Sequence, residues 1–211
     1  MSDKAYHRDC FPFDPRRRIV WQTLVAAVFQ KEIPSAGVVL DLGAGYGDFI
    51  NSAKAQRRLA VDVWPGMLSH LEPDVEGLVT RINQLDAIAD DSLDYVFSSN
   101  CFEHAPQSEL IECLGQLRRK MKAGSQLTIV QPNYKYCKRH YFDDHTHVSV
   151  YSDDTLSEIL VSNGFRVSRR VPRFLPLTLR SWLPVHPLLI RLYLASPVKP
   201  MAQQMLICAI R

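Results

Sequence analysis

Three glycines at alternate positions follow a short apolar stretch in the segment VVLDLGAGYG, residues 38–47. Gly43 and Gly45 would let the backbone turn sharply and bring its N–H groups against a ligand, because no Cβ atom stands in the way. The opposing interpretation is a plain structural turn. The glycines alone do not decide between the two, so the residues around them have to.

Two aspartates favour a ligand. Asp41 ends the first predicted strand, and Asp62 ends the next one about 20 residues after Gly43, where a carboxylate can accept both hydroxyls of a ribose. Asp41 would repel a pyrophosphate, but it suits a ligand with an ammonium or sulfonium charge. The glycine spacing is G-x-G-x-G rather than the G-x-G-x-x-G of dinucleotide sites. Together these features favour S-adenosylmethionine over NAD.

Histidines in two later loops are candidate general bases, which a hydroxyl acceptor would need. The segment CFEHAP places Glu103 and His104 after the fourth predicted strand, and YFDDHTHVSVYS places Asp144, His145 and His147 after the fifth. Asp143 or Asp144 could orient His145 or His147 there. His104 could instead cap the next helix, and the second loop could be an ordinary polar loop. Because H-x-H has no visible third ligand, we expect no metal.

Alternating apolar strands and amphipathic helices must position these residues. Such alternation predicts parallel strands joined by right-handed crossovers, with helices on both faces of the sheet. A good N-cap at Ser152 begins one helix, and Gly124 is expected to end another. The predicted strands are 38–42, 59–63, 78–82, 93–100, 125–132, 165–171 and 204–211, and the predicted helices are 16–32, 47–56, 68–76, 108–121, 152–162 and 187–194.

The composition bounds the class of protein. A chain of 211 residues with 46% hydrophobic and 22% charged residues suits one globular domain. The net charge of +3 and the short, scattered basic clusters argue against nucleic acid as a partner. Five cysteines without a CxxC pair indicate a reducing compartment, and no signal peptide or membrane span is visible. We therefore expect a cytoplasmic protein.

Several motifs together resemble the class I S-adenosylmethionine-dependent methyltransferases. These are VLDLGAGYGDF, AVDVWP, DDSLDYVFSSNCFEH and MKAGSQLTIVQPN. The resemblance implies an α/β, Rossmann-like, doubly wound sheet of seven strands, mostly parallel with the last strand antiparallel. It also implies a single domain over residues 1–211. Its expected parts are an N-terminal helical cap (1–36), a cofactor-binding core (37–171), a proline-rich, lid-like insert (172–200) and a closing strand (201–211).

The resemblance also assigns roles around S-adenosylmethionine. Asp41, Gly43, Ala44 and Gly45 would face the methionine moiety, Asp62 would bind the ribose, and Asn100 would lie near the reacting methyl group. Val63 and Trp64 would flank the adenine. Relatives often place an aspartate after the third strand to bind the adenine amino group, whereas this chain offers Gln84, Leu85 and Asp86.

The expected activity is methyl transfer to a small-molecule acceptor, at a hydroxyl of a saccharide or glycan-pathway intermediate. The saccharide comes from a looser resemblance of RFLP, LPVHPLLIRLYL and QQMLICAIR to a bacterial subgroup found with sugar-modifying enzymes. One alternative is a non-catalytic, cofactor-binding partner protein, in which substitution of the histidines changes no turnover. The other is an NAD-dependent oxidoreductase. The apolar 172–200 insert is expected to pack and act as a lid, with peripheral membrane contact as the alternative.

Overall fold

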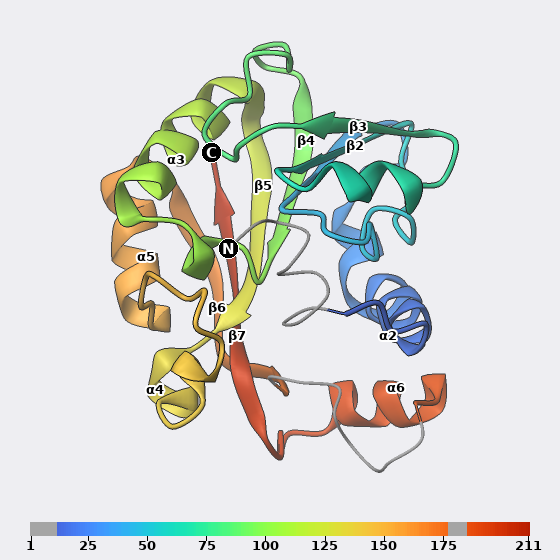
Figure 1. Ribbon diagram of the computed structural model, residues 1–211, viewed down its shortest axis with the longest axis vertical. Coiled ribbons are helices and arrows are strands. Elements are labelled where there is room, and N and C mark those ends of the chain that lie inside the picture. Colours follow the sequence, from blue (N-terminus) through green and yellow to red (C-terminus); the bar gives the residue numbers. More distant parts are fainter. Residues whose placement is uncertain (1–11, 177–184) are drawn as a thin grey trace.

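The computed structural model describes residues 12–176 and 185–211 of the chain. A single seven-stranded sheet runs through it in the order β3-β2-β1-β4-β5-β7-β6 (Figure 1). The strands are β1 Val38–Leu42, β2 Arg57–Asp62, β3 Val75–Val79, β4 Leu93–Ser99, β5 Met121–Pro132, β6 Arg166–Pro176 and β7 Ala202–Ile210.

All neighbours from β3 to β5 pair in parallel, and β7 is antiparallel to both β5 and β6. The predicted sheet, mostly parallel with its last strand antiparallel, is therefore confirmed. The order places β1 between β2 and β4, so the chain winds in one direction from β1 to β3 and in the other from β4 onward. Ligands of open α/β sheets bind beyond the carboxyl ends of the strands at such a switch point.

Helices cover both faces of the sheet (Figure 1). Within the described residues, four are α-helices of at least nine residues, and α4 and the 3-10 helices are shorter. The helices are α2 Arg16–Leu24, followed by the π-helical η1 Val25–Phe29 and the 3-10 helix η2 Gln30–Glu32; η3 Pro65–Ser69; η4 Phe102–His104; α3 Gln107–Lys120; α4 Tyr134–Cys137; η5 Tyr141–Asp143; α5 Asp153–Ser162; and α6 Pro187–Ala195.

Successive side chains of a strand point to opposite faces of the sheet, so the strands contribute to two separate hydrophobic cores, one on each face. On one face, α3 and α5 pack on the sheet through residues such as Leu114 and Leu160. On the other face, α2 and η1 contribute Leu24 and Phe29, and α6 packs there through Ile190. The strands contribute Leu40, Leu42, Val96 and Ile129 to the first core, and Val39, Phe97, Val130 and Leu206 to the second.

The predicted helix 47–56 is wrong. Residues 45–52 form successive turns, and Asn51 bonds across to another part of the chain: its Nδ2 donates to the His70 carbonyl at 2.8 Å, and its Oδ1 accepts from the Glu72 N–H at 2.9 Å. An asparagine side chain that bonds backbone groups elsewhere competes with helix formation. These bonds therefore fold the segment against residues 70–72 instead.

Other predicted boundaries also move. The helix expected at 68–76 is only η3, and the weak strand at 78–82 lies at β3, three residues earlier. Gly124 does not end α3, because the backbone is already extended at Met121 and Gly124 lies inside β5. The helix expected at 16–32 is divided into α2, η1 and η2, and its Ile19 and Ala27 are exposed.

The predicted insert 172–200 begins too early. β6 continues to Pro176, which pairs with Ala202 of β7, so residues 172–176 belong to the sheet. Prolines fit there because β6 is an edge strand. In the remaining part of this segment, Ile190 and Leu194 contact the second core, while Leu188 and Leu192 are exposed. Residues 1–11, with Tyr6 and His7, and residues 177–184 lie outside the described part.

Within the described residues, no helix combines the length and apolar character needed to cross a membrane.

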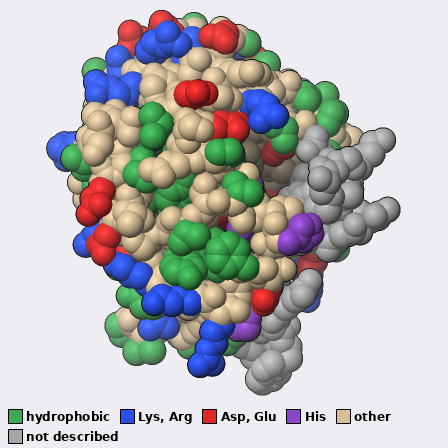
Figure 2. Space-filling view, turned by 60° about the vertical axis from the view of Figure 1, so that its left-hand side comes forward, with side chains coloured by type: hydrophobic (Ala, Val, Ile, Leu, Met, Phe, Trp, Pro, Cys, Tyr) green, Lys and Arg blue, Asp and Glu red, His purple; other side chains and the backbone are tan. Residues whose placement is uncertain are grey.

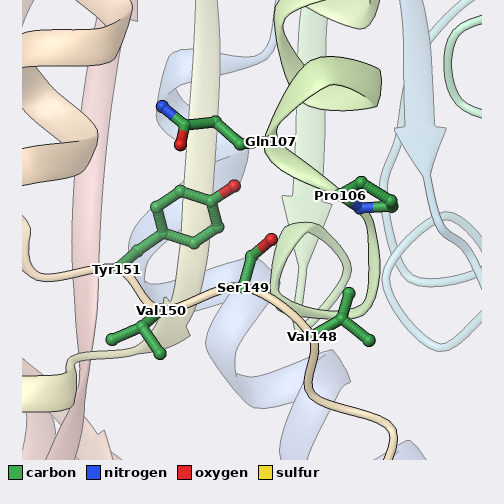
Figure 3. Close-up of a pocket in the computed structure, with 6 residues that line it drawn as sticks. All are labelled: Pro106, Gln107, Val148, Ser149, Val150 and Tyr151. Carbon is green, nitrogen blue, oxygen red and sulfur yellow. The ribbon is translucent and has the colours of Figure 1, made fainter.

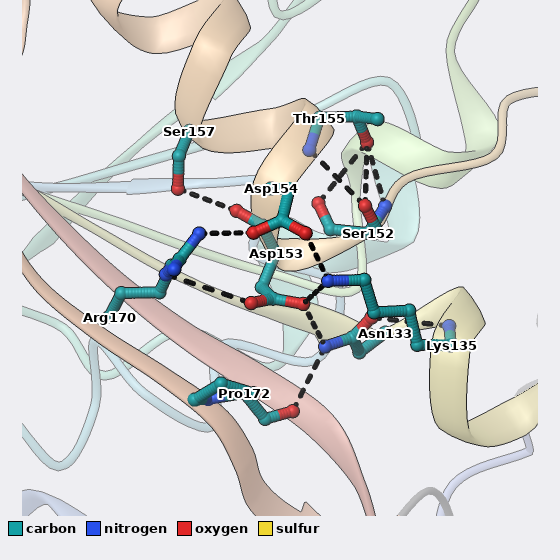
Figure 4. Close-up of polar contacts among 9 residues, drawn as sticks. All are labelled: Asn133, Lys135, Ser152, Asp153, Asp154, Thr155, Ser157, Arg170 and Pro172. Atoms are coloured by element: carbon teal, nitrogen blue, oxygen red, sulfur yellow. Dashed lines mark hydrogen bonds and ion pairs between the residues drawn. The ribbon is translucent and has the colours of Figure 1, made fainter.

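A buried polar network fixes the carboxyl end of β5 to α5 and β6 (Figure 4). The Asn133 Nδ2 donates to Asp153 Oδ1 at 2.9 Å and to the Pro172 carbonyl at 3.0 Å. Asp153 is 2% exposed, and its carboxylate also pairs with Lys135 at 3.0 Å and Arg170 at 3.6 Å. Ser152 caps α5 as the sequence predicts, in a reciprocal pair with Thr155. The network anchors both ends of the loop between β5 and α5.

Replacing Asp153 by alanine tests this network. The Asn133 amide would lose its buried acceptor, so we expect the free energy of unfolding to fall by about 2 kcal/mol. For a chain of this length, that lowers Tm by roughly 4–8 °C in a thermal melt followed by circular dichroism. Asp154→Ala, which removes an exposed carboxylate that also pairs with Lys135 and Arg170, should leave Tm almost unchanged. Equal effects of the two variants would contradict the proposed anchor.

Candidate cofactor and acceptor site

The glycine loop after β1 is tied to the end of β2. The N–H groups of Gly43 and Ala44 both donate to the Val61 carbonyl, at 2.8 and 3.0 Å. The Gly45 N–H donates to Asp62 Oδ2 at 2.8 Å. Contrary to the sequence expectation, these N–H groups are bonded to β2 rather than left to face a ligand. What remains for a ligand is the close approach that the missing side chains permit.

Asp62 lies at the carboxyl end of β2, where the sequence places it. Its Oδ2 accepts the Gly45 N–H, and its Oδ1 accepts the Trp64 N–H at 2.8 Å. Two backbone bonds therefore orient this half-buried carboxylate. An ionised carboxylate has about four lone-pair positions, so the same group can also accept the two hydroxyls of a ribose.

Asp41 is buried at the end of β1, with 3% of its surface exposed. Burial raises the pKa of its carboxyl well above the ordinary value, nearby Asp62 and Asp48 raise it further, and a hydrogen bond from the Ile50 N–H opposes the shift. The bond to Ile50 holds the chain that follows the glycine loop. A cation brought to Asp41 would stabilise its ionised form.

Aromatic side chains pack beside the glycine loop. Trp64 meets the Tyr46 ring edge-on at 5.1 Å and stacks on His70 at 5.7 Å between centroids. Phe13, ahead of α2, contacts both Tyr46 and His70 at 5.4 and 5.5 Å. The N-terminal segment therefore reaches the loop. Tyr46 and His70 are absent from the predicted site, although Tyr46 stands inside the glycine motif; the predicted Val63 is exposed beside this group.

The segment after β3 is hydrogen-bonded to the backbone of Asp62. The Thr80 N–H donates to the Asp62 carbonyl at 3.0 Å, and the Thr80 hydroxyl donates to the Gln84 carbonyl at 3.3 Å. Gln84 and Asp86 are exposed, whereas the Leu85 side chain is buried in the first core. Of the three predicted adenine neighbours, Leu85 therefore has only its backbone to offer, and the side chains of the other two remain candidates.

The end of β4 meets the glycine loop through Cys101. A Cβ atom on Gly43 would lie 2.5 Å from the Cys101 Sγ and 2.7 Å from its Cβ. The preceding residue, Asn100, has a φ of +48°, which asparagine tolerates better than most residues. Its N–H donates to the Val130 carbonyl at 2.9 Å. Nothing in the sequence marks Cys101, because its importance comes from this contact between two loops.

The loops after β4 and β5 are joined by hydrogen bonds. The Glu103 carbonyl accepts the N–H groups of Val148 and Ser149 at 2.9 and 3.1 Å, and the Ser149 hydroxyl donates to the Ala105 carbonyl at 2.7 Å. The Tyr141 hydroxyl donates to the Ser149 carbonyl at 2.5 Å. These bonds bring together candidate residues that are about 40 positions apart in the sequence.

His104 and Asp144 are connected through Thr146. The Thr146 hydroxyl donates to Asp144 Oδ1 at 2.5 Å, and the same oxygen lies 2.9 Å from His104 Nδ1. Because the hydroxyl proton is directed at Asp144, His104 Nδ1 must be the donor, which places the ring's lone pair on Nε2. Thr146, which is missing from the predicted site, is the link between two predicted residues.

His147 lies beside His104, with ring centroids 4.8 Å apart. Its Nδ1 donates to the Tyr141 carbonyl at 2.5 Å, so its lone pair is also on Nε2. Burial lowers the pKa of His104 to about 4, with a further contribution from His147, and burial lowers the pKa of His147 as well. Asp144 also faces both rings. Burial raises its pKa, but hydrogen bonds from Thr146 outweigh this and lower it.

Glu103 is fully buried between the two loops. Burial raises the pKa of its carboxyl to about 8, and nearby Asp144 acts in the same direction. His145, by contrast, is exposed. The structure therefore brings together His104, His147 and Asp144 of the predicted catalytic residues. It leaves His145 at the surface, where the chain turns at residues 145 and 146.

A surface pocket of about 400 Å³ lies next to these loops (Figure 3). It does not include any predicted cofactor residue. Hydrophobic side chains gather on the face drawn in Figure 2, with basic side chains below them. In the loop between β5 and α5, the hydrophobic residues Phe142 and Val148 are 57% and 62% exposed. The pocket is lined by Pro106, Gln107, Val148, Ser149, Val150 and Tyr151.

Comparison with known proteins identifies the family of the chain. The family model described as "Methyltransferase domain" matches residues 13–169. The chain belongs to this methyltransferase family. Family membership supports S-adenosylmethionine as the cofactor, as the sequence predicts. No curated protein sequence matches the chain significantly.

Solved structures share the methyltransferase fold. A SAM-dependent methyltransferase from Archaeoglobus fulgidus is 24% identical, with a TM-score of 0.68 and coverage of 92% of this chain and 94% of that one. The methyltransferase in a Haloferax volcanii complex with the Trm112 methyltransferase activator is 19% identical, with a TM-score of 0.70 and coverage of 99% and 94%. Geranyl diphosphate C-methyltransferase from Streptomyces coelicolor A3(2) is 14% identical, with a TM-score of 0.61 and coverage of 89% and 77%.

A methyl group added at Gly43 tests the contact between the loops. Gly43→Ala would place its Cβ against Cys101 in a backbone of φ +77°. We expect it to lower the free energy of unfolding by about 1–3 kcal/mol and to weaken cofactor binding, measured by thermal melts and calorimetry. Gly115→Ala is the matched control. Nothing lies within 4 Å of its added Cβ in α3, so it should stabilise the protein by roughly 0.5–1 kcal/mol. Stabilisation by both variants would refute a tight approach at Gly43.

Proposed function

We propose that this methyltransferase transfers the methyl group of S-adenosylmethionine to a hydroxyl of a small-molecule acceptor, a saccharide or a glycan-pathway intermediate. The observation that supports cofactor use most directly is the position of Asp62. Its carboxylate stands at the carboxyl end of β2, and hydrogen bonds from Gly45 and Trp64 orient it beside the glycine loop. The choice of a saccharide follows from the sequence resemblance alone.

The cofactor would lie over the carboxyl ends of β1, β2 and β4. In this proposal Asp62 binds the ribose, and Val63 with Trp64 flanks the adenine, together with Gln84, the backbone of Leu85, or Asp86. The methionine moiety lies along Gly43, Ala44 and Gly45. Its ammonium group faces the carboxylate of Asp41, and Asn100 lies near the methyl group.

The reaction needs little covalent participation by the protein, because the sulfonium methyl is already activated. The acceptor oxygen attacks the methyl carbon, the carbon–sulfur bond breaks, and the electron pair stays on sulfur, which leaves S-adenosylhomocysteine. The protein has to align the two reactants and exclude water. A base takes the hydroxyl proton. His104 and His147 are the candidates within the joined loops, and Asp144 is placed to orient His104 through Thr146.

Ligand-induced stabilisation tests the cofactor. At about 100 times its Kd, S-adenosylhomocysteine should add about 2.7 kcal/mol of stability, which raises Tm by roughly 5–11 °C, whereas NAD should not. Asp62→Ala should weaken S-adenosylhomocysteine binding by about 1.5–3 kcal/mol, as expected for lost hydrogen bonds to a charged group. Asp74→Ala is the control, because its carboxylate pairs with Arg58 at the surface. Stabilisation by NAD alone would make the protein an oxidoreductase and end the proposal.

Release of S-adenosylhomocysteine tests the acceptor. Purified protein and S-adenosylmethionine would be incubated with neutral saccharides, nucleotide sugars, lipid-linked sugars and a prenyl diphosphate in separate reactions. We expect turnover with a hydroxylated sugar, and a drop in kcat of about 100-fold or more in His147→Gln if that ring is the base. His140→Gln, an exposed neighbour paired with Asp143, should keep normal turnover. Turnover only with the prenyl diphosphate would reject the saccharide; equal rates in both variants would reject His147.

A further inference from the structure

The Glu103 carboxylate is buried without a hydrogen-bond partner. Its residue is 0% exposed, and within residues 12–176 and 185–211 neither Oε1 nor Oε2 has an acceptable donor. Its own backbone N–H favours the ionised form of the carboxyl and lowers its pKa slightly against the effect of burial. A buried carboxylate is normally paired with a cation or coordinates a metal ion, because removal from water is otherwise strongly unfavourable. A buried carboxyl group can also stay protonated, and a cation bound beside it would favour its ionised form.

Two imidazole rings lie next to this carboxylate. One ligand atom from each of Glu103, His104 and His147 can be chosen so that all three lie within 4.8 Å of one another. The three residues come from two loops, since Glu103 and His104 belong to η4 and His147 lies beyond η5. The backbone bonds from Val148 and Ser149 to the Glu103 carbonyl hold these loops together. The cluster is thus built by tertiary contacts and not by neighbouring positions in one segment.

The hydrogen bonds of both histidines are compatible with metal binding through Nε2. Each donates its Nδ1–H, one to the Thr146 hydroxyl and the other to the Tyr141 carbonyl, and so carries its lone pair on Nε2. Histidines that bind metals usually donate their other N–H to a carbonyl or a carboxylate-linked group in this way, which fixes the ring and the tautomer. Asp144 Oδ2 lies 4.0 Å from His147 Nε2 and adds negative charge to the site.

We propose that Glu103, His104 and His147 bind a divalent transition-metal ion. Two imidazoles and one carboxylate form a set that Zn²⁺ accepts in catalytic sites while keeping a fourth position open, with metal–ligand distances of about 2.0–2.2 Å. Ligand atoms around such an ion are about 3.3 Å apart, so the loops have to close by roughly 1.5 Å at most from the present separation. The ion also provides the partner that the Glu103 carboxylate lacks.

The open position of this ion would suit an oxygen of the acceptor. A bound hydroxyl would lose its proton more readily and would be held near the methyl group. With both histidines on the metal, the proton would pass to solvent water, and the two rings would be metal ligands instead of the base. This part of the inference rests on the proposed function, whereas metal binding itself does not. The site also differs from the H-x-H pattern of the sequence, because the exposed His145 takes no part. The earlier expectation of a metal-free protein is replaced by this proposal.

Direct metal binding tests the site. The tag-free full chain would be stripped with a chelator, dialysed against Zn²⁺, Mn²⁺ or Mg²⁺ in turn, and analysed for bound metal by mass spectrometry. Affinity for Zn²⁺ would be measured by competition with a chromophoric chelator. We expect one Zn²⁺ per chain, tighter than Mn²⁺ and much tighter than Mg²⁺. Glu103→Gln and His147→Gln should each weaken Zn²⁺ binding by about 100-fold or more, and His140→Gln should bind like the wild type.

Cobalt substitution separates this site from the cysteines. Co²⁺ at Glu103 and the two histidines should give visible d–d bands without a thiolate charge-transfer band. Three results would overturn the proposal. They are a thiolate charge-transfer band, binding of less than one Zn²⁺ per chain, and unchanged Zn²⁺ affinity in both Glu103→Gln and His147→Gln. S-adenosylhomocysteine binding shows that each variant is folded. The same measurement distinguishes the two hypotheses. Zinc binding without cofactor binding would reject only the proposed function, and cofactor binding without zinc binding would reject only the metal site.

Discussion

The bond between the Asp62 carboxylate and the Gly45 N–H is the constraint on which the cofactor side of the structure depends. It fixes the glycine loop to the end of β2, and two further N–H groups of the loop reach the Val61 carbonyl. Because hydrogen bonds from Gly45 and Trp64 orient the carboxylate, little conformational freedom would be lost when a ribose binds. The close approach of Cys101 to Gly43 then places the end of β4 at the same point.

The acceptor side depends on a different set of contacts. β4 and β5 are adjacent and parallel, so the loops that follow them leave the same edge of the sheet. Backbone bonds to the Glu103 carbonyl join the two loops, and the Asn133–Asp153 pair anchors the second loop where it leaves β5 and enters α5. These anchors hold two imidazoles and two carboxylates in a half-buried space. Such a concentration of ionisable groups with shifted pKa values is typical of functional sites.

Sequence reasoning succeeded where local pattern and long-range order agree. The parallel strands, the capped helix that begins after Ser152, and the strands that carry Asp41 and Asp62 follow from periodicity and caps. The count of seven strands and the antiparallel last strand came from the resemblance to the family. Sequence reasoning failed at residues 47–56, where the Asn51 side chain bonds the backbone of residues 70–72. It also failed at Gly124, because pairing of Met121 with Leu93 turned the chain into a strand before the glycine was reached. In both places a distant partner overrode a local preference.

The amino-acid sequence by itself determined the methyltransferase fold and the residues at the ends of its strands, because strand and helix periods and the glycine spacing are local properties of the chain. It also supplied His104, His147 and Asp144 as candidates. Only the tertiary structure decided that Thr146 links two of them, that His145 stays outside, and that Glu103 lies buried against both imidazoles. Those relations depend on how two loops about 40 residues apart meet above neighbouring strands, and no local pattern encodes that meeting.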